Sequence, residues 1–542
     1  MVIILSTILI KIINIKNFKY VKQFINHNCI NFNKENYKTN NKILVEVFDY
    51  KPSTISLSYL SNILSQKYKA KIVGYYPGFL SLKSNFKRIF LEKCDPHNIK
   101  EIYKSFGVKN FIIPKSSKSK TQDLLFIKIY KNIKTKENIL DIKIDGIILG
   151  DLIYDEFLRS NNLVTIEIAS NTFQVFLKEA ISLYFFWKNI FKTEKIKSVV
   201  VSHNVYYMGF ICRIAIYNNI PVYSNGLTNI QYLTKSYPQK HCGYENYLKI
   251  FKKFNINLQK KFLAEAEKQL SDRFAGEKDI KLLMDRHTNK DFYNKNVSSK
   301  KMLSKNKFKV LIAAHQFNDA VHAYGYKFLF NDFYEWIDFL GKCTEKTDYE
   351  WYIKFHPAEF KKNYKYIEYF AKKYPKFVIL PNDVTNNQLI KEKINIVLTI
   401  YGSVGHEYPL FGIPVINASN EGAHKSFDFN IYPKDFKEYE KLILNLDKVP
   451  KVKVNLIKKK LYIYYLMRFL MDYYPIDDFK GTLIKLGSDF PTGKIYNVFL
   501  KQIQKQKDSD KILKVYRDFV NSKKFRMYGN NLNKKSELIG FY

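Results

Sequence analysis

Three short segments of the sequence carry side chains that suit the binding of a phosphorylated ligand. A run of apolar residues precedes each one: His315 opens the segment HQFND, His356 and Pro357 open HPAEF, and Gly402 opens GSVGHE. Glycines let backbone amides approach a ligand closely, and imidazole and hydroxyl groups donate hydrogen bonds to phosphate oxygens. Each feature alone also fits an ordinary turn, but the three together favour a binding site.

The segment GSVGHE is the most informative of the three. A helix that begins near Ser403, capped by the serine hydroxyl, would point its free N–H groups and positive dipole end at a bound anion. The residues expected to contact the phosphate are Gly402, Ser403, Val404 and Gly405, with His356 and Pro357 on its other side. Glu407, one turn into the helix, is placed to accept hydrogen bonds from ribose hydroxyls.

The phosphate-binding motifs of other nucleotide enzymes are missing from the sequence. Neither GxxxxGK[ST] nor GxGxxG occurs, which argues against a P-loop enzyme and against an ordinary dehydrogenase. No arginine lies between Arg286 and Arg468. We therefore expect the cradle to use amides, hydroxyls, histidines and lysines.

Carboxylates and an arginine follow the apolar segment IDGIILG, which we expect to end a strand near Gly150. Asp151, Asp155 and Arg159 are spaced so that they share one face of a helix, and Arg159 is able to pair with Asp155. Asp151 is our first choice for a catalytic base that faces the cleft, with Asp319 and His315 as alternatives. The same spacing also fits a salt-bridged surface helix.

A second loop in this part of the chain, SHNVYY, follows the apolar run KSVVV. Its His203, Asn204 and Tyr206, together with Arg159, form the predicted acceptor side of the site. The five cysteines are isolated and form no CxxC motif, so we predict neither a metal site nor a disulfide framework.

These segments need a scaffold that brings the ends of several strands to one edge. Strand-like and helix-like segments alternate from about residue 42 to 230, and a second alternation runs from about 306 to 420. Such alternation predicts parallel sheets covered by helices, with ligands at the carboxyl ends of the strands. The predicted fold class is therefore α/β, with two Rossmann-like doubly wound domains that face a central cleft.

The expected divisions of the chain follow from this alternation and from the polar, lysine-rich stretch between its two parts. They are an N-terminal extension at 1–41, an acceptor-side domain at 42–230, a linker at 231–305, a nucleotide-binding domain at 306–450 and a helical C-terminal extension at 451–542. The opening MVIILSTILIKIINI is apolar but short, and fits a weak signal, a peripheral anchor or an overcalled start codon.

The net charge of +39 comes mostly from lysine, since only eight of the 89 basic residues are arginines. Dedicated readers of nucleic acid rely on the planar fork of arginine, so specific nucleic-acid binding is not expected. Scattered lysines suit an anionic membrane surface better. Together with the isolated cysteines, this charge predicts a cytoplasmic protein, peripheral on the inner face of the cytoplasmic membrane.

The segments IKFHP and GSVGHEYPLFGIPVI, within two Rossmann-like halves, resemble those of GT-B glycosyltransferases. The nearest resemblance is to bacterial capsule and surface-polysaccharide transferases. These include capsular Kdo transferases, sialyl- and polysialyltransferases with a His-Pro motif, and CDP-glycerol glycerophosphotransferases. The resemblance is strongest over residues 305–420 and only architectural over 42–230. The acidic motif of the sialyltransferases does not align, so that motif identifies neither the base nor the donor nucleotide here.

The resemblance implies an inverting transferase that needs no metal or cofactor and takes a nucleotide-activated sugar, with a CMP-sugar as first choice. The acceptor would be a glycan or a lipid-linked glycan. By the same resemblance, His356 and Ser403 contact the donor phosphate, Glu407 contacts the ribose, and the base is an acidic residue of the first domain. Two alternatives stay open: a UDP-sugar 2-epimerase-like enzyme of the same fold, and a non-catalytic GT-B-fold scaffold of polysaccharide assembly.

Overall fold

The structure is a computed structural model of the 542-residue chain. It describes residues 19–32, 37–48, 51–79, 99–225, 230–239, 243–276, 303–304, 307–320, 322, 327–356, 363–471, 496–498, 500–501, 509–530 and 537–542. The apolar opening at 1–18 and Pro357 lie outside the described residues.

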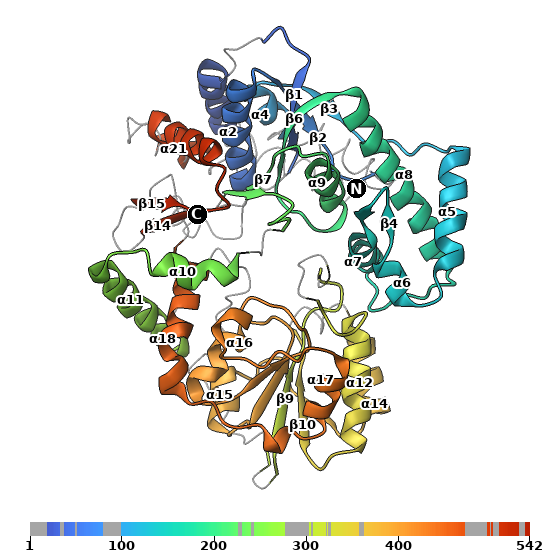
Figure 1. Cartoon of the computed structure of the whole chain (residues 1–542), viewed down its shortest axis with the longest axis vertical. Helices are drawn as coiled ribbons and strands as arrows, with labels where there is room; N and C mark the ends of the chain where they lie inside the picture. Colours follow the sequence, from blue (N-terminus) through green and yellow to red (C-terminus); the bar gives the residue numbers. More distant parts are fainter. Residues whose placement is uncertain are drawn as a thin grey trace, which may run out of the picture.

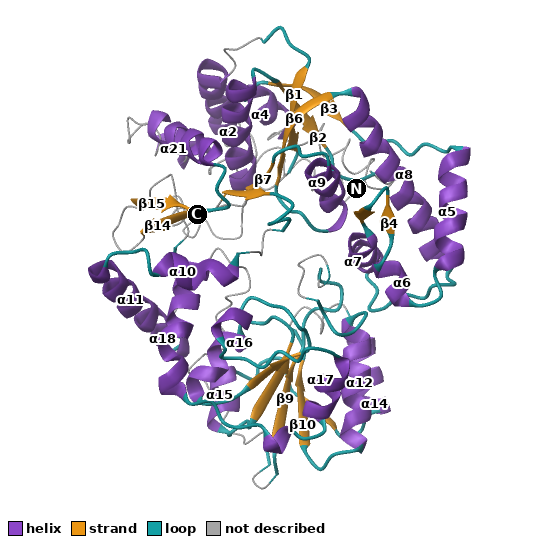
Figure 2. Cartoon of the chain, in the orientation of Figure 1, coloured by secondary structure: helices purple, strands orange, loops and turns teal. Residues whose placement is uncertain are grey.

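The first domain is built on a six-stranded sheet (Figures 1 and 2). Its strands, in spatial order, are β3 (Val108–Ile112), β2 (Lys71–Tyr75), β1 (Asn41–Glu46), β6 (Lys195–Val201), β7 (Val222–Asn225) and β8 (Ile230–Leu233). Only the edge strand β8 runs antiparallel to its neighbour. The central strands are runs of buried β-branched and aliphatic residues, as expected where helices cover both faces.

Each face of this sheet has its own core. One face packs against α7 (Gly150–Asn161), α8 (Asn171–Thr193) and α9 (Tyr206–Tyr217), and α5 (Lys120–Asn132) packs outside α8. The other face packs against α2 (Lys51–Tyr68), α4 (Ile99–Ser105) and α21 (Ser509–Ser522).

The second domain is built on a five-stranded sheet in which every pairing is parallel. Its strands, in spatial order, are β11 (Phe377–Ile379), β10 (Glu350–Lys354), β9 (Lys309–Ala313), β12 (Ile396–Thr399) and β13 (Val415–Asn417). One face packs against α12 (Phe333–Glu345), α14 (Tyr364–Lys373) and α17 (Phe436–Ile443), and the other against α15 (Asn386–Lys391). The predicted α/β class with two parallel-sheet units is confirmed.

The segment before Asp151 differs from the prediction. Residues 143–148 form a small antiparallel hairpin, β4 (Lys143–Ile144) and β5 (Ile147–Ile148), which is separate from the main sheet. Asp145 and Gly146 have φ angles of 51° and 80°, so the chain reverses in a tight turn where we expected a continuous strand. Asp151 therefore does not follow a strand of the parallel sheet.

The described residues beyond 450 do not form a separate helical extension. Helices α10 (Tyr247–Phe251), α11 (Ile256–Phe274) and α18 (Val454–Tyr465) share one apolar cluster, so both stretches that connect the domains lie together. Beyond them, α21 joins the core of the first domain, and β14 (Met527–Asn530) pairs with β15 (Glu537–Phe541). This antiparallel pair is a departure from the all-helical tail that we expected.

The two domains also contact each other directly, on the side of the molecule that holds α6 (Lys136–Leu140), α7 and α12 (Figure 1). The buried carboxylate of Asp332 accepts hydrogen bonds from Tyr154 at 2.7 Å and Thr165 at 2.6 Å. Lys136 lies 3.1 Å from the same carboxylate oxygen. These three partners all belong to the first domain. Among the described helices, none is both long enough and apolar enough to cross a bilayer.

Candidate functional site

The three predicted strand ends of the second domain lie together in the structure. Strands β10, β9 and β12 are neighbours in the sheet, so the segments after them meet at its carboxyl edge. The Cε1 atom of His315 lies 3.4 Å from the position that a Cβ would take on Gly402. Burial, and then the nearby His356, lower the pKa of His315 to about 3. The structure thus brings His315, His356 and Gly402 to one place.

His315 is held as a neutral imidazole. Its ring stacks on Tyr401, with the ring centroids 4.2 Å apart. Its Nε2 atom lies 3.4 Å from the Tyr401 backbone N–H, which donates to it, and 3.2 Å from the Thr399 hydroxyl. Because Nε2 accepts a hydrogen bond, the ring proton is placed on Nδ1. His315 is therefore suited to donate a hydrogen bond and is a poor proton acceptor at neutral pH.

The Gly-Ser loop departs from the predicted helix start in two ways. Helix α16 (Val404–Glu407) has only four residues before it tightens into a 3₁₀ turn, so its dipole is small. The Ser403 side chain makes no capping hydrogen bond; instead, the Ser403 carbonyl accepts from the amides of His406 and Glu407. The Ser403 residue is exposed, whereas Gly405 is buried. An accessible hydroxyl on a short glycine loop is what the structure offers a ligand.

Charged side chains that sequence analysis did not foresee lie beneath this loop. Glu407 is fully buried, and its Oε1 accepts hydrogen bonds from Arg273 of α11, at 2.9 Å from Nε and 2.7 Å from Nη2. The ribose contact of Glu407 stays a prediction. In the structure its carboxylate is buried and is bonded to an arginine. The arginine comes from the stretch that we expected to be a linker, 134 positions away in sequence.

Two further cations lie close to the loop. Lys354, at the end of β10, is buried, and burial lowers its pKa to about 8 although the charge of Glu407 opposes the shift. Arg468 lies in the π-helical turn that follows α18. Burial, then Arg273 and Arg468, lower the pKa of the neighbouring His406 to about 3. This region is positively charged, because three cations lie near one carboxylate. The cations are Arg273, Lys354 and Arg468, and the carboxylate is that of Glu407.

The carboxylates of α7 have partners other than the predicted ones. Asp151 forms a two-pronged ion pair with Arg213, with both N–O distances 2.5 Å. Asp155 lies 2.7 Å from Nδ1 of His322, in the second domain. Arg159 does not pair with Asp155: its guanidinium stacks over the ring of Tyr206, 4.1 Å from the centroid. Our expectation of an Asp155–Arg159 pair was wrong, because each group has a nearer partner outside the helix.

Asp319 lies where the two domains meet. Its Oδ1 accepts a hydrogen bond from the Ala320 amide at 2.9 Å and lies 3.4 Å from the hydroxyl of Tyr206 in the first domain. Its Oδ2 lies 3.4 Å from the hydroxyl of Tyr401, the residue before Gly402. Among the three candidate bases, Asp319 is the carboxylate next to the Gly-Ser loop, and no described cation pairs with it.

The predicted acceptor loop is shaped by backbone strain and by buried hydrogen bonds. Tyr206 has a φ angle of 56°, which is uncommon for a bulky residue and concentrates at functional sites. Asn204 is buried and donates to the Pro238 carbonyl at 3.2 Å. The preceding Ser202 donates from its amide and its hydroxyl to Glu46, whose pKa burial raises to about 7. His203 is half-buried beside them.

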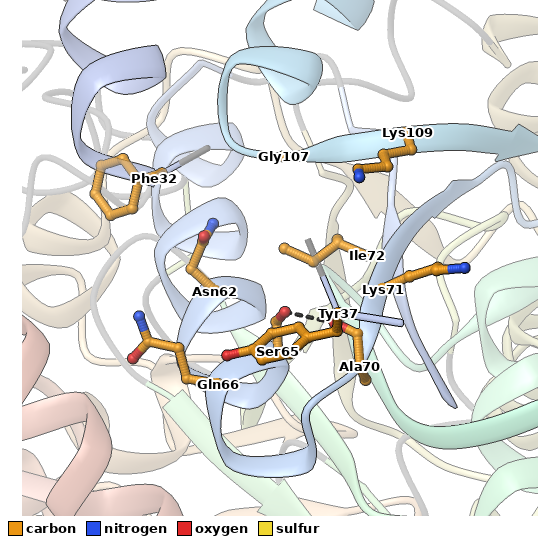
Figure 3. Close-up of a pocket in the computed structure, with 10 residues that line it drawn as sticks. All are labelled: Phe32, Tyr37, Asn62, Ser65, Gln66, Ala70, Lys71, Ile72, Gly107 and Lys109. Carbon is orange, nitrogen blue, oxygen red and sulfur yellow. Dashed lines mark hydrogen bonds between the residues drawn. The ribbon is translucent and has the colours of Figure 1, made fainter. Parts of the chain in front are cut away.

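A small pocket elsewhere in the first domain does not belong to this site (Figure 3). It encloses about 30 Å³ and is lined by Asn62, Lys71 and Lys109, among others. Lys71 and Lys109 lie at the amino-terminal ends of β2 and β3, whereas ligands of open α/β sheets bind at the carboxyl ends. The described residues contain no cluster of histidine, cysteine or acidic side chains that could hold a metal ion.

Comparisons with known proteins add fold neighbours of low similarity. No family model matches the sequence, and no curated protein matches it as a relative. The solved UDP-GlcNAc 2-epimerase from Neisseria meningitidis, bound to UDP-GlcNAc, is 11% identical, with a TM-score of 0.22, 79% of this chain covered and 98% of that one. The wall teichoic acid polymerase TagF is 13% identical, with a TM-score of 0.20 and coverage of 93% and 99%.

A third neighbour is MnaA of S. aureus with UDP, which is 12% identical with a TM-score of 0.26 and coverage of 83% and 98%. At these TM-scores and identities, the structural similarity between the three proteins and this chain is weak. Its fold is defined by its own two sheets: a two-domain α/β architecture with a candidate anion site at the carboxyl edge of the second sheet.

Proposed function

We propose that the protein is a glycosyltransferase of the GT-B type that uses a nucleotide-activated sugar, without a metal, in the synthesis of a capsule or surface polysaccharide. One observation supports this most: a Gly-Ser loop with an exposed serine lies at the carboxyl edge of a parallel sheet, and Arg273, Lys354 and Arg468 lie close to its Glu407 or His406. Together they offer a phosphate group hydrogen-bond donors and a positive potential.

In this proposal the donor phosphate binds at Gly402, Ser403 and Val404. Neutral His315 donates through Nδ1–H, and His356 completes the phosphate contacts. As the sugar–phosphate bond breaks, charge grows on the leaving phosphate, and these fixed donors with the cations below them stabilise it. A CMP-sugar is the first donor to test. The acceptor is a glycan or a lipid-linked glycan at the inner face of the cytoplasmic membrane.

The geometry moves our choice of base from Asp151 to Asp319. Asp151 is neutralised by Arg213, whereas Asp319 is bordered by two phenol hydroxyls at 3.4 Å and adjoins the phosphate loop through Tyr401. In this role Asp319 takes the proton of the acceptor hydroxyl as that oxygen attacks the anomeric carbon. Tyr206 and Arg159, stacked on each other, then form the acceptor wall.

The test measures nucleotide binding and its dependence on the exposed serine hydroxyl. Thermal unfolding is followed with CMP, CDP, UDP, GDP and ADP, each with and without magnesium, because binding to the native state raises Tm. We expect a metal-independent shift that Ser403→Ala reduces, with affinity falling about tenfold for one lost hydrogen bond. No shift with any nucleotide would leave the scaffold as the better hypothesis.

Turnover then separates the transferase from the epimerase. UDP-GlcNAc is incubated with the protein alone, and the sugar is followed by NMR. An unchanged sugar is expected. Inversion at C2 without any acceptor would replace our proposal with a UDP-sugar 2-epimerase.

A further inference from the structure

Helix α5 exposes large apolar side chains on its outer surface, and its inner surface is packed against the first domain. Leu124 and Ile127 are 58% and 57% exposed, and their spacing of three residues puts them on one face of the helix. Phe126 is buried in the core of the first domain, where its ring stacks on that of Tyr130. The helix is thus held by one face while the opposite face presents two large aliphatic side chains to solvent.

Lysines surround this apolar pair. Lys120, Leu124, Ile127 and Lys131 follow a helical spacing, so they form one stripe with a lysine at each end. Six lysines between residues 115 and 134 are exposed, against the single acidic residue Asp123: Lys115, Lys118, Lys120, Lys128, Lys131 and Lys134. Within the described residues, none of the six forms an ion pair. We call this stripe and its lysines the α5 face.

The neighbouring helix α8 contacts α5 at the ring of Phe126. The ammonium group of Lys178 lies 4.6 Å from the centre of the Phe126 ring, so this part of α8 adjoins α5. One turn earlier, Val175 is 48% exposed. Glu179, the next residue after Lys178, is exposed and is the single acidic residue of α8. The α5 face is therefore apolar at its centre and mainly basic around it.

We propose that the α5 face docks on the surface of a bilayer that contains anionic lipids. Lysines at its rim pair with lipid phosphates, and Leu124 and Ile127 enter the boundary between headgroups and acyl chains. A second copy of the chain fits poorly, because six lysines would meet six lysines. Single-stranded nucleic acid also fits poorly, since neither an arginine nor an exposed aromatic ring is present on the face to stack on a base.

Docking of the α5 face on a bilayer does not cover the candidate site. In Figure 1, α5 lies at the outer edge of the first domain, on the side opposite to α10 and α11. Docking through α5 leaves the second domain and its Gly-Ser loop accessible to a soluble nucleotide. The inference rests on the proposed function only in giving a reason for membrane contact, and the binding itself is measured without any donor or acceptor.

The test is co-sedimentation of the full chain with vesicles of phosphatidylcholine alone and of phosphatidylcholine mixed with phosphatidylglycerol. We expect binding only to the anionic vesicles, weakened by salt. Leu124→Ser with Ile127→Ser should lower the partition coefficient at least about tenfold. Lys120→Glu with Lys131→Glu should lower it by about the same factor or more, since each lysine contributes about a fivefold gain.

Matched controls come from equally exposed positions elsewhere. Ile256→Ser with Leu456→Ser removes side chains that are 62% and 72% exposed, and Lys437→Glu with Lys441→Glu reverses two exposed charges on α17. Neither control should change vesicle binding, and unchanged Tm values verify the fold of all variants. Equal losses in controls and α5 variants would overturn the proposal.

A second result would also overturn the proposal. If vesicle binding survives the Leu124 and Ile127 changes but DNA competes it away, the face is a nucleic-acid surface. Nucleotide-induced Tm shifts are recorded on the unmodified chain as well as on the α5 variants. An unmodified chain that fails to bind anionic vesicles but keeps its nucleotide shifts refutes the docking surface alone. An unmodified chain that binds the vesicles but shows no nucleotide shift refutes the proposed function alone.

Discussion

Asp151 and Asp319 have different expected roles. Asp151 is a structural carboxylate paired with Arg213, and Asp319 is the candidate base. Asp151→Asn leaves the largely buried guanidinium of Arg213 without its counter-ion, so we expect a loss of about 1–3 kcal/mol in the free energy of unfolding. Asp319→Asn keeps the hydrogen bond to the Ala320 amide and should change stability little. Turnover with a competent donor should fall at least about a hundredfold for Asp319→Asn.

Chemical denaturation and single-turnover rates of the two variants measure these effects. An active Asp319→Asn enzyme alongside a folded but inactive Asp151→Asn enzyme would return the base to Asp151. Full activity of both variants would exclude both carboxylates as the base.

Residue types alone identified the candidate ligand loop but not the charged side chains near it. His315, His356 and the Gly-Ser segment were recognisable because each directly follows an apolar run, and parallel strands end at the same edge. Arg273 carried no local signal, since its partner Glu407 is 134 residues away and only the packing of α11 brings them together. Pairings of that kind depend on tertiary structure, which spacing in the sequence does not encode.

At the scale of elements, α16 shows how a four-residue helix is held without a side-chain cap. Gly405 packs so closely that a Cβ would lie 2.6 Å from Cε1 of His424 and 2.8 Å from Nδ2 of Asn430. Both neighbours are bonded to each other, at 3.2 Å, and His424 is buried. They therefore have little freedom to move away from a larger side chain.

Gly405→Ala should displace the Gly-Ser loop, costing about 1–3 kcal/mol and most of the nucleotide affinity. Gly402→Ala is the matched control for stability alone, because its nearest neighbour would be the Thr399 hydroxyl at 3.2 Å, and a small adjustment relieves that contact. Tm without nucleotide compares the stability of the two variants, and Tm with nucleotide measures the affinity of Gly405→Ala against the unmodified chain. Equal losses of stability in the two variants would contradict the role of close packing at Gly405.

The strands of the two parallel sheets were predictable from the sequence. The segments that differ from the prediction do so for local reasons. Runs such as KILVEVF and INIVLTI are short, apolar and β-branched, which suits buried parallel strands. IDGIILG has the same composition, but Asp145 and Gly146 adopt left-handed backbone angles and turn it into a hairpin. Strands β14 and β15 pair in antiparallel fashion, a pattern that their scattered apolar residues did not indicate.

At the scale of the whole molecule, Asp332 holds the domains together. It caps α12, accepting from the Glu335 amide at 2.9 Å, and also accepts from Tyr154 and Thr165 of the other domain. Asp435 caps α17 with the same geometry, at 2.9 Å from the Glu438 amide. Asp435→Ala should therefore cost only about 1 kcal/mol.

Asp332→Ala should cost about 2–4 kcal/mol, because buried donors of the first domain also lose their acceptor. Chemical denaturation of both variants gives the difference, which reports the contacts between domains. Equal costs would show that Asp332 acts only as a helix cap.

His322 should make the same interface depend on pH. Burial alone would lower the pKa of His322, but the facing Asp155, 2.7 Å away, more than offsets this and raises the pKa above its ordinary value. A raised pKa in the folded state stabilises it most below about pH 6.5, and this contribution is lost as pH rises through the folded-state pKa. Unfolding free energies from pH 5 to 9 test this, and His322→Gln should flatten the profile.

The chain passes between the domains twice, and both passages are packed into the single cluster of α10, α11 and α18. Figure 1 shows that cluster on one side of the molecule, with α6, α7 and α12 on the other. Two covalent connections on one side define a hinge axis, so any rotation of the domains moves the far side most. Asp332 and His322 lie on that far side, so the two domains can move apart there only after the hydrogen bonds of these residues to the first domain have broken.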